Sequence, residues 1–280
     1  MQDLMPILST LRRHKTAASL IVLEIALSFA IVCNALFLIS QRYESLTRPS
    51  GAPEDEMIVV GVAGKGGGAD ADLLTQQDLA AMRALPGVKA VTIENQTLYG
   101  GNHNSNGVSL QPKQQNSTLE AGYWSASEGF SVVHGLKFVE GRDFLPEEIE
   151  NGSAYEKKPR SGAVIVNRAA AAKLFPGRSA VGQLIYTSET TPSKIVGVVE
   201  NLGPVSASRG SFEAEPYQVL DSERPAYSRG ANYVLRVDAA RKDAILKDAV
   251  AAVQKVDPLR IVLRQSTMNE MRATYYAQDR

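Results

Sequence analysis

Cysteine is almost absent from this chain of 280 residues: Cys33 is the only one, and it lies in the most apolar segment. One cysteine can build neither a disulfide framework within the chain nor a cysteine-based metal site. Histidine is scarce as well, since His14, His103 and His134 lie far apart, the last at an expected strand end, and no pair has metal-ligand spacing. We therefore expect no metal, no redox centre and no cofactor.

An excess of either charge is also missing. Lys plus Arg and Asp plus Glu both number 30, so the formal net charge is zero. Without a basic surface, nucleic acid is not an expected partner. The chain is 44% hydrophobic and 21% charged, a composition typical of globular protein rather than of a disordered segment.

Motifs of catalysis are not evident. The loop at 64–68 contains Gly64-Lys65, but Gly66 follows where a phosphate-binding loop needs Ser or Thr. No serine stands in the Gly-x-Ser-x-Gly pattern. A long Asn- and Gln-rich loop at 95–116 could contact a partner or could simply be mobile.

One acidic cluster could suggest a paired-carboxylate hydrolase. Its members are Asp143, Glu147, Glu148 and Glu150. We favour a solvated turn, because no apolar setting is evident that would raise the pKa of one carboxyl group. The sequence thus predicts no catalytic, cofactor-binding or metal-binding residue, and no enzymatic activity.

A long apolar run marks the N-terminal part. Residues 17–39 hold one ionisable side chain, Glu24, and as a helix they would span roughly 35 Å, enough to cross a bilayer. Arg12, Arg13 and Lys15 precede the run, whereas acids are mixed into its far flank. The positive-inside rule therefore predicts a cytoplasmic N-terminus at 1–16, a membrane helix at 17–40 and the remainder outside the cytoplasm.

Two other interpretations of this run are open. A cleaved signal peptide could end near 33–35, although the run is longer than such segments usually are; a lipoprotein signal is weaker, because Val32 precedes Cys33. Glu24 and the stripe Ala26, Ala30, Asn34 share one helix face and favour packing against other membrane helices. Alternatively, Glu24 snorkels or is protonated in a lone anchor.

After a linker at 41–56, the pattern changes to alternating strands and helices. A strand is expected at 57–63 and another at 88–96. Between them we expect a helix that begins at Thr75, with Asp78 as a near capping box, and ends at Pro86-Gly87. Its inward residues would be Leu79, Met82 and Leu85.

A similar unit recurs later, with a strand at 232–238, an amphipathic helix at 240–256 and a strand at 260–265. The predicted fold class is α+β: a transmembrane helix, then a split ferredoxin-like βαβ/βαβ layer from 57–98 and 219–267. A β-rich subdomain would be inserted at 99–218. Residues 268–280 would form a helix leading toward a second membrane span.

Residues 164–201 carry the most specific pattern. A buried strand at 164–166 is followed by a helix capped by Asn167, a stop at Pro176-Gly177 and a strand at 194–199. Gly197 within that strand suggests close backbone approach or a bulge. With Gly141-Arg142-Asp143-Phe144 and the Val256-Asp257-Pro258 corner, this order resembles the MacB-like periplasmic core domain of ABC transporter permeases, in the FtsX-like permease family.

The resemblance implies a bacterial inner-membrane protein whose residues after about 40 are periplasmic. Such permeases have four membrane helices, form homo- or heterodimers in membrane lipid, and work with a cytoplasmic ABC ATPase. A periplasmic adaptor protein is a further partner that the resemblance implies. The sequence matches only the N-terminal part, either as a fragment or as a naturally short protein.

The leading hypothesis is a membrane-anchored periplasmic core that transmits ATP-driven motion to a periplasmic partner or substrate in export. The alternative is a single-pass, membrane-anchored scaffold that binds a periplasmic partner without transport activity. A third, an anchored enzyme, would require a hydrolytic activity that depends on one polar residue. The resemblance does not choose among drugs, peptides, lipoproteins and cell-wall machinery as the substrate.

Overall fold

The computed structural model describes residues 15–47, 50–64, 71–101, 104–152, 162–202, 216–225 and 230–277. It divides into two units, Met1–Arg48 and Pro49–Gln278. His14, His103 and Lys65, which the sequence raised as candidates, lie outside the described residues.

The first unit contains α2 (Lys15–Thr47). Its segment Ser19–Ser40 has a mean hydropathy of 2.4 and is not buried, so by length and composition it could cross a membrane. Glu24, Cys33 and Asn34 are all exposed on this helix. The predicted helix at 17–40 is therefore present within a longer one.

The second unit begins with a four-stranded antiparallel sheet in the order β13-β1-β12-β2. Its strands are β1 (Met57–Ala63), β2 (Val88–Glu94), β12 (Gly230–Val237) and β13 (Ile261–Thr267). This order, with the first and second strands separated by the third, is that of a split ferredoxin-like layer. The predicted fold class is confirmed.

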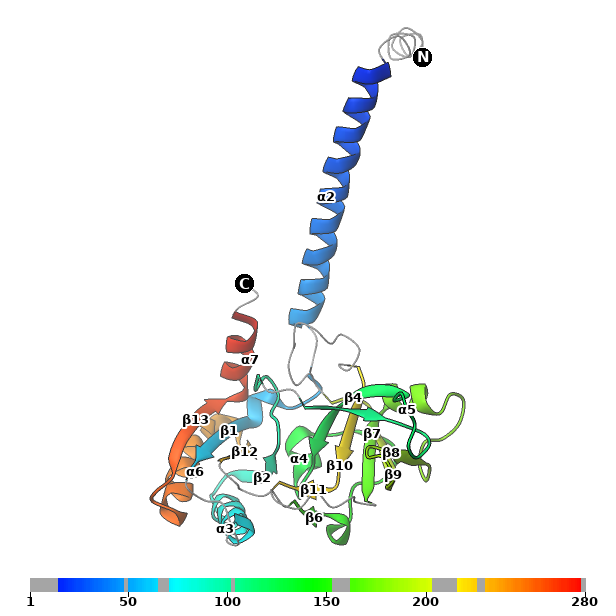
Figure 1. Ribbon diagram of the computed structural model, residues 1–280. Helices are drawn as coiled ribbons and strands as arrows, with labels where there is room; N and C mark the ends of the chain where they lie inside the picture. Colours follow the sequence, from blue (N-terminus) through cyan, green and yellow to red (C-terminus); the bar gives the residue numbers. More distant parts are fainter. Residues whose placement is uncertain are drawn as a thin grey trace. The chain divides into compact units, whose positions relative to one another are not determined.

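Helices α3 (Ala71–Arg83) and α6 (Lys242–Val256) cover one face of this sheet (Figure 1). The 3₁₀ turn η3 (Ala239–Arg241) precedes α6. Between the helices and the strands lies a core of aliphatic side chains with Tyr233, including the predicted inward residues Leu79 and Met82. Burial of such side chains stabilises a fold by about 1.5–3 kcal/mol each.

The predicted start of α3 is wrong. The helix begins at Ala71, so Thr75 lies inside it, where its hydroxyl donates to the Ala71 carbonyl at 2.9 Å. Asp78 does not cap the helix either; it is buried and accepts a hydrogen bond from Tyr233. A hydroxyl and a carboxylate three residues apart are common at helix starts, and here a tertiary partner takes the carboxylate instead.

A second, mixed sheet follows the order β3-β4-β10-β7-β9-β5, and β8 pairs with β9. Its strands are β3 (Ser105–Val108), β4 (Leu119–Ser125), β5 (Phe138–Gly141), β7 (Ala163–Asn167), β8 (Leu184–Tyr186), β9 (Pro192–Val199) and β10 (Gln218–Asp221). Two short strands, β6 (Glu150–Asn151) and β11 (Glu223–Arg224), pair separately. The boundary predicted at residue 219 falls inside β10, which pairs with β4 and β7 and so belongs to this sheet.

The 164–199 region folds largely as its pattern predicts. Asn167 caps α5 (Arg168–Leu174), with its side-chain oxygen accepting from the Ala170 amide at 3.0 Å. A Cβ at Gly197 would lie 2.3 Å from the Arg142 carbonyl oxygen. The expected close approach at Gly197 is therefore present, between β9 and the end of β5.

The polar loop at 95–116 is expected from its sequence either to contact a partner or to be mobile. It contains β3, and Gln96, Leu98 and Tyr99 within it are buried. The side chains of Asn95 and Gln96 both donate to the Tyr123 carbonyl, at 3.1 and 3.0 Å. The amide-rich composition therefore satisfies a buried backbone group at the contact between the two sheets.

His134 lies at the end of a helix, α4 (Phe130–His134), and not at the end of a strand. Gly129 and Gly135 flank this helix with φ angles of 82° and 61°, which lets the chain turn sharply at both ends. In Figure 1, α4 lies between the two sheets, and it contacts β2 and β12. Trp124, the only tryptophan, is fully buried beside Phe130 and His134.

Candidate functional site

The 3₁₀ turn η1 (Glu54–Glu56) consists of three acidic residues, and all three bind other elements of the second unit. Glu54 binds Arg272 and Asp55 accepts from Asn269 at 2.7 Å, both on α7 (Met268–Ala277). Glu56 accepts from Lys89 of β2 and Arg236 of β12, at 2.8 and 2.7 Å. The start of the unit is thereby bonded both to its sheet and to its last helix.

Glu54 is the centre of this arrangement. Its carboxylate accepts two hydrogen bonds of 3.0 Å from Nη1 of Arg272 and one of 2.8 Å from the hydroxyl of Tyr99. The Ser50 hydroxyl also donates to it. The Glu54 side chain is 13% exposed and that of Arg272 28%, so water screens this ion pair less than it would on an open surface.

Aromatic rings surround the Arg272 guanidinium. Its central carbon lies 5.8 Å from the ring centre of Tyr99 and 5.9 Å from that of Tyr276. Tyr99 also contacts Tyr275, with ring centres 5.5 Å apart. Such cation–π contacts typically stabilise by about 0.5–2 kcal/mol when partly desolvated. We call Ser50, Glu54, Tyr99, Arg272, Tyr275 and Tyr276 the Glu54 cluster.

Tyr99 holds an unusual backbone conformation, with a φ of 58°. A bulky residue in the left-handed region is strained and persists only where its surroundings fix it. Burial, followed by the hydrogen bond to Glu54, raises the pKa of the Tyr99 hydroxyl, which therefore stays a donor. The contacts of the Glu54 cluster therefore hold Tyr99 in this backbone conformation.

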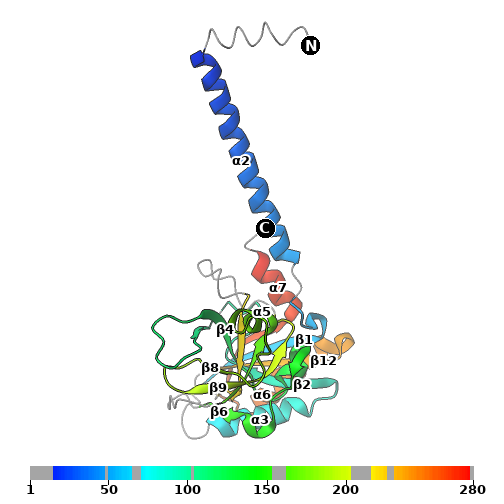
Figure 2. The same cartoon turned by 90° about the vertical axis from the view of Figure 1, so that its right-hand side faces the viewer.

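The sequence carries one signal for this cluster, which the predictions above do not include. Arg272, Tyr275 and Tyr276 follow the i, i+3, i+4 spacing of one helix face. Glu54, Asp55 and Glu56 lie at the end of the expected linker, where acidic side chains are usually exposed to solvent. Only the fold brings the two segments together, because they lie at opposite ends of the unit. Figures 1 and 2 show α7 directly after β13, beyond the end of the sheet.

A second polar feature connects the two sheets. Glu94 at the end of β2 and His134 of α4 are fully buried and 2.6 Å apart, from Oε1 to Nε2. Burial raises the pKa of Glu94, and His134 opposes that rise. Beside them, the hydroxyls of Thr92 and Ser127 lie 2.8 Å apart. Together these contacts fix β2 against α4.

The buried carboxylate of Asp78 joins α3 to β12 and to the turn before β13. It accepts from the Tyr233 hydroxyl at 2.5 Å and from the guanidinium of Arg260. Burial raises the pKa of Asp78, against the hydrogen bonds from Arg260 and Tyr233. This group is fully buried beside the core of the first sheet.

The acidic cluster at 143–150 lies in the turn between β5 and β6, and its last member, Glu150, begins β6. Arg142 binds Glu148 with two hydrogen bonds of 2.7 and 2.6 Å, while Asp143 accepts from Ser131 at 2.9 Å. Arg142 holds the pKa of Glu148 below its usual value. Glu147 and Glu148 lie in the short 3₁₀ turn η2 (Pro146–Glu148). Among the described residues, no group of three or more His, Cys, Asp or Glu side chains could hold a metal ion.

Solved structures of two transporter domains are similar to this chain. One is the extracellular domain of the noncanonic ABC-type transporter YknZ from Gram-positive bacteria, with 15% identity, a TM-score of 0.45, and coverage of 74% of this chain and 100% of that one. The other is the periplasmic region of MacB from Actinobacillus actinomycetemcomitans, with 13% identity, a TM-score of 0.45, and coverage of 82% and 97%.

A comparison with curated protein sequences gives no significant match. The sequence model of the MacB-like periplasmic core domain matches residues 18–256, which include the membrane-span candidate and most of both sheets. The chain therefore belongs to the family of MacB-like periplasmic core domains, which are parts of ABC transporter permeases.

Proposed function

We propose that the chain is the membrane-anchored periplasmic core of an ABC transporter permease and transmits ATP-driven motion to a periplasmic partner or substrate. The observation that carries this proposal is the bond between Glu54 of η1 and Arg272 of α7. It joins the segment that follows the membrane-span candidate to the last helix of the unit. Movement of either segment is thus passed to the other through the Glu54 cluster.

The remaining contacts of η1 pass such movement into the sheet. Glu56 is bonded to β2 and β12, and Glu94 with His134 joins β2 to α4 between the two sheets. Each step is a charged or buried hydrogen bond between named elements. The unit can therefore shift as one body, which suits transmission better than an internal reaction.

The proposal places the N-terminus in the cytoplasm, the residues after about 40 in the periplasm, and α2 in the bacterial inner membrane. Arg12, Arg13 and Lys15 before the span support this orientation. The partners would be a cytoplasmic ABC ATPase, a second permease subunit and a periplasmic adaptor. We propose no enzymatic role for the chain itself.

Co-expression of the whole chain with permease helices of the same family and with ABC ATPases encoded beside it tests this function. We expect an ATPase to co-purify, and amide hydrogen exchange in the second unit to change when ATP is added. An ATPase variant that cannot hydrolyse ATP is the control. Failure of every neighbouring ATPase to co-purify would leave the anchored scaffold as the better description.

A double variant in the Glu54 cluster tests the role of this contact directly. In such a complex, Glu54→Gln with Arg272→Gln should keep the ATPase bound but abolish the ATP-dependent change in hydrogen exchange. The matched control is Arg168→Gln, which breaks the exposed pair between Arg168 of α5 and Glu200 after β9 and should leave the change intact. An unchanged ATP-dependent change in hydrogen exchange in this double variant would contradict the role given to the Glu54 cluster.

A further inference from the structure

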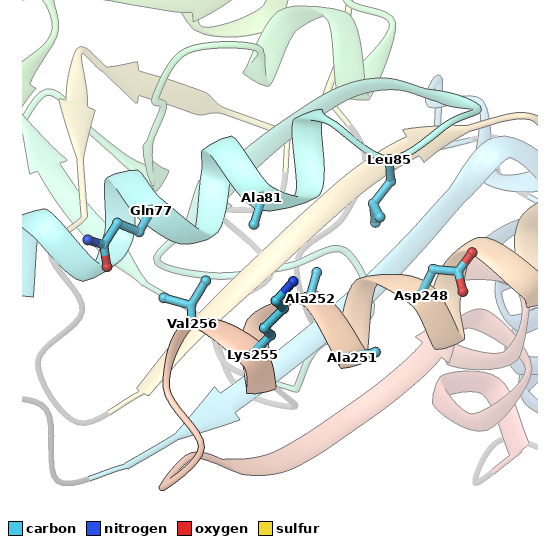
Figure 3. Close-up of a pocket in the computed structure, with 8 residues that line it drawn as sticks. All are labelled: Gln77, Ala81, Leu85, Asp248, Ala251, Ala252, Lys255 and Val256. Atoms are coloured by element: carbon cyan, nitrogen blue, oxygen red, sulfur yellow. The ribbon is translucent and has the colours of Figure 1, made fainter.

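A groove of about 690 Å³ runs between α3 and α6 on the side of these helices away from the sheet (Figure 3). On the α3 side it is lined by Gln77 and Ala81 of the helix and by Leu85, which lies just after the helix ends. Its wall on α6 consists of Asp248, Ala251, Ala252, Lys255 and Val256. Most of the lining side chains are small or apolar, namely Ala81, Leu85, Ala251, Ala252 and Val256.

Two opposite charges flank the α6 wall. Asp248 and Lys255 are exposed, and within the described part of the chain neither has an ion-pair or hydrogen-bond partner. They are seven residues apart, almost two helical turns, so they share one side of α6 at a separation of roughly 10 Å along its axis. Unpartnered charges of both signs beside an apolar groove fit a partner surface with the same two charges in reverse order.

The sequence of α6 supplies that reversed order itself. The midpoint between Asp248 and Lys255 falls between Ala251 and Ala252, the smallest side chains of the wall. A second α6, antiparallel and related by a two-fold axis through this midpoint, would place its Lys255 opposite Asp248 and its Asp248 opposite Lys255. A two-fold contact repeats each pairing, so both charges on both copies are matched.

We propose that this groove is an interface with a second copy of the chain, in which the two α6 helices cross antiparallel at Ala251 and Ala252. The alanines permit close approach of the helix axes, at about 8 Å. The charges set direction and register, because a parallel second helix would bring like charges together. The proposal rests on the proposed function only in that both copies share one membrane.

Cysteine cross-linking of the whole chain in native membranes tests the crossing point. In a Cys33→Ser background, Ala251→Cys or Ala252→Cys should form a disulfide-linked dimer when an oxidant is added, since Cα atoms about 4–7 Å apart can be bridged. The control is Ala244→Cys, which is exposed on α6 but would lie roughly 20 Å from its copy. No dimer at 251 and 252, or equal dimer at 244, overturns the proposal.

Charge reversal tests the register. In the Ala251→Cys chain, Asp248→Lys alone and Lys255→Asp alone should each reduce the cross-linking yield about tenfold, because two attractive pairs become repulsive. The double variant Asp248→Lys with Lys255→Asp should restore it. Lys247→Asp, an exposed reversal outside the groove wall, is the matched control and should leave the yield unchanged. Failure of the double variant to recover overturns the proposal.

Two other results would assign the dimer contact or the groove differently. The start of β13 exposes Ile261 and Leu263, which form a competing apolar surface. Loss of cross-linking with Leu263→Lys but not with Asp248→Lys would assign dimerisation to that strand, and transfer of the cross-link to another protein would assign the groove to a different partner. Either result overturns the proposal. Because cross-linking needs no ATPase, its failure is distinguishable from failure of the proposed function.

Discussion

Arg272 donates from a single nitrogen, Nη1, to both carboxylate oxygens of Glu54 at 3.0 Å each, although 218 positions separate the two residues in the sequence. This relationship ties the last helix of the second unit to the turn that begins it. It is also the contact whose removal has the clearest predicted consequence.

Breaking this ion pair should destabilise the second unit. We expect Glu54→Gln or Arg272→Met to lower the free energy of unfolding by about 1–3 kcal/mol, the range for hydrogen bonds to charged groups that are partly buried. The double variant should cost less than the sum of the single variants, because the two residues interact directly. Urea titration of the whole chain in detergent, followed by the fluorescence of Trp124, measures each value.

The comparison pair joins the start of α5 to the residue that follows β9. Arg168 and Glu200 are 2.7 Å apart, with side chains 60% and 49% exposed. Arg168→Met should change the stability by no more than about 0.5 kcal/mol, because water screens an exposed pair. Equal effects at Arg168 and Arg272 would show that partial burial does not strengthen the Glu54 contact.

Glu94 should make stability depend on pH in a defined direction. Burial raises its pKa above 4.5, so the folded protein holds the proton more tightly than the unfolded chain. Its contribution is then complete below about pH 4.5 and is lost as the pH rises through the folded-state pKa. Glu94→Gln cannot ionise, so the stability advantage of the wild type over this variant should shrink from pH 4.5 upward. Parallel urea midpoints across pH 4.5–7.5 would contradict the assignment.

Removing only one partner of the buried Asp78–Arg260 ion pair should strongly destabilise the second unit. We expect Arg260→Met to lower the free energy of unfolding by roughly 3–5 kcal/mol, because it leaves the buried carboxylate without its charged partner. Adding Asp78→Leu should recover part of that loss, since neither charge then remains buried. A double variant that is less stable than Arg260→Met would show that the pair itself is strongly stabilising.

Alanine substitutions at two glycines should distinguish the cost of backbone strain from the cost of a steric clash. Gly141 and Gly177 have φ angles of 72° and 74°. A Cβ at Gly141 would lie 2.2 Å from the Val196 carbonyl oxygen, whereas nothing lies within 4 Å of a Cβ at Gly177. Gly177→Ala should therefore cost about 1 kcal/mol from strain alone. Gly141→Ala should cost clearly more, as thermal unfolding of both variants would show.

Local patterns predicted most of the fold. The strands predicted at 57–63 and 260–265, observed at 57–63 and 261–267, and the Asn167 cap depend on nearby residues, so their alternation and capping chemistry are visible in the sequence. The start of α3 was misplaced because Thr75 and Asp78 satisfy a capping pattern while their true partners are Ala71 and, far away, Tyr233. Long-range partners leave no such local trace.

The candidate site was hidden for the same reason. In the sequence, Glu54 is one of several acids in a linker, and only the fold brings Arg272 beside it. Gln96 is one of several polar residues in a loop, and only the fold shows that it donates to the Tyr123 carbonyl. His134 looked like the end of a strand because its helix has only five residues and is bounded by glycines. Pairing between distant segments decides each of these cases, and no periodicity encodes it.

The position of the Glu54 contact determines how the second unit resists a pulling force. β1 and β13 are antiparallel neighbours, with Ile58 opposite Thr267, so η1 and α7 leave the sheet at the same end. Traction on these two segments would load the rungs of that ladder one after another, as in unzipping, rather than all together in shear. The bonds of Glu54 and Asp55 to α7 precede the first rung and would break first. A few side-chain hydrogen bonds therefore set the force at which the β1–β13 ladder begins to open.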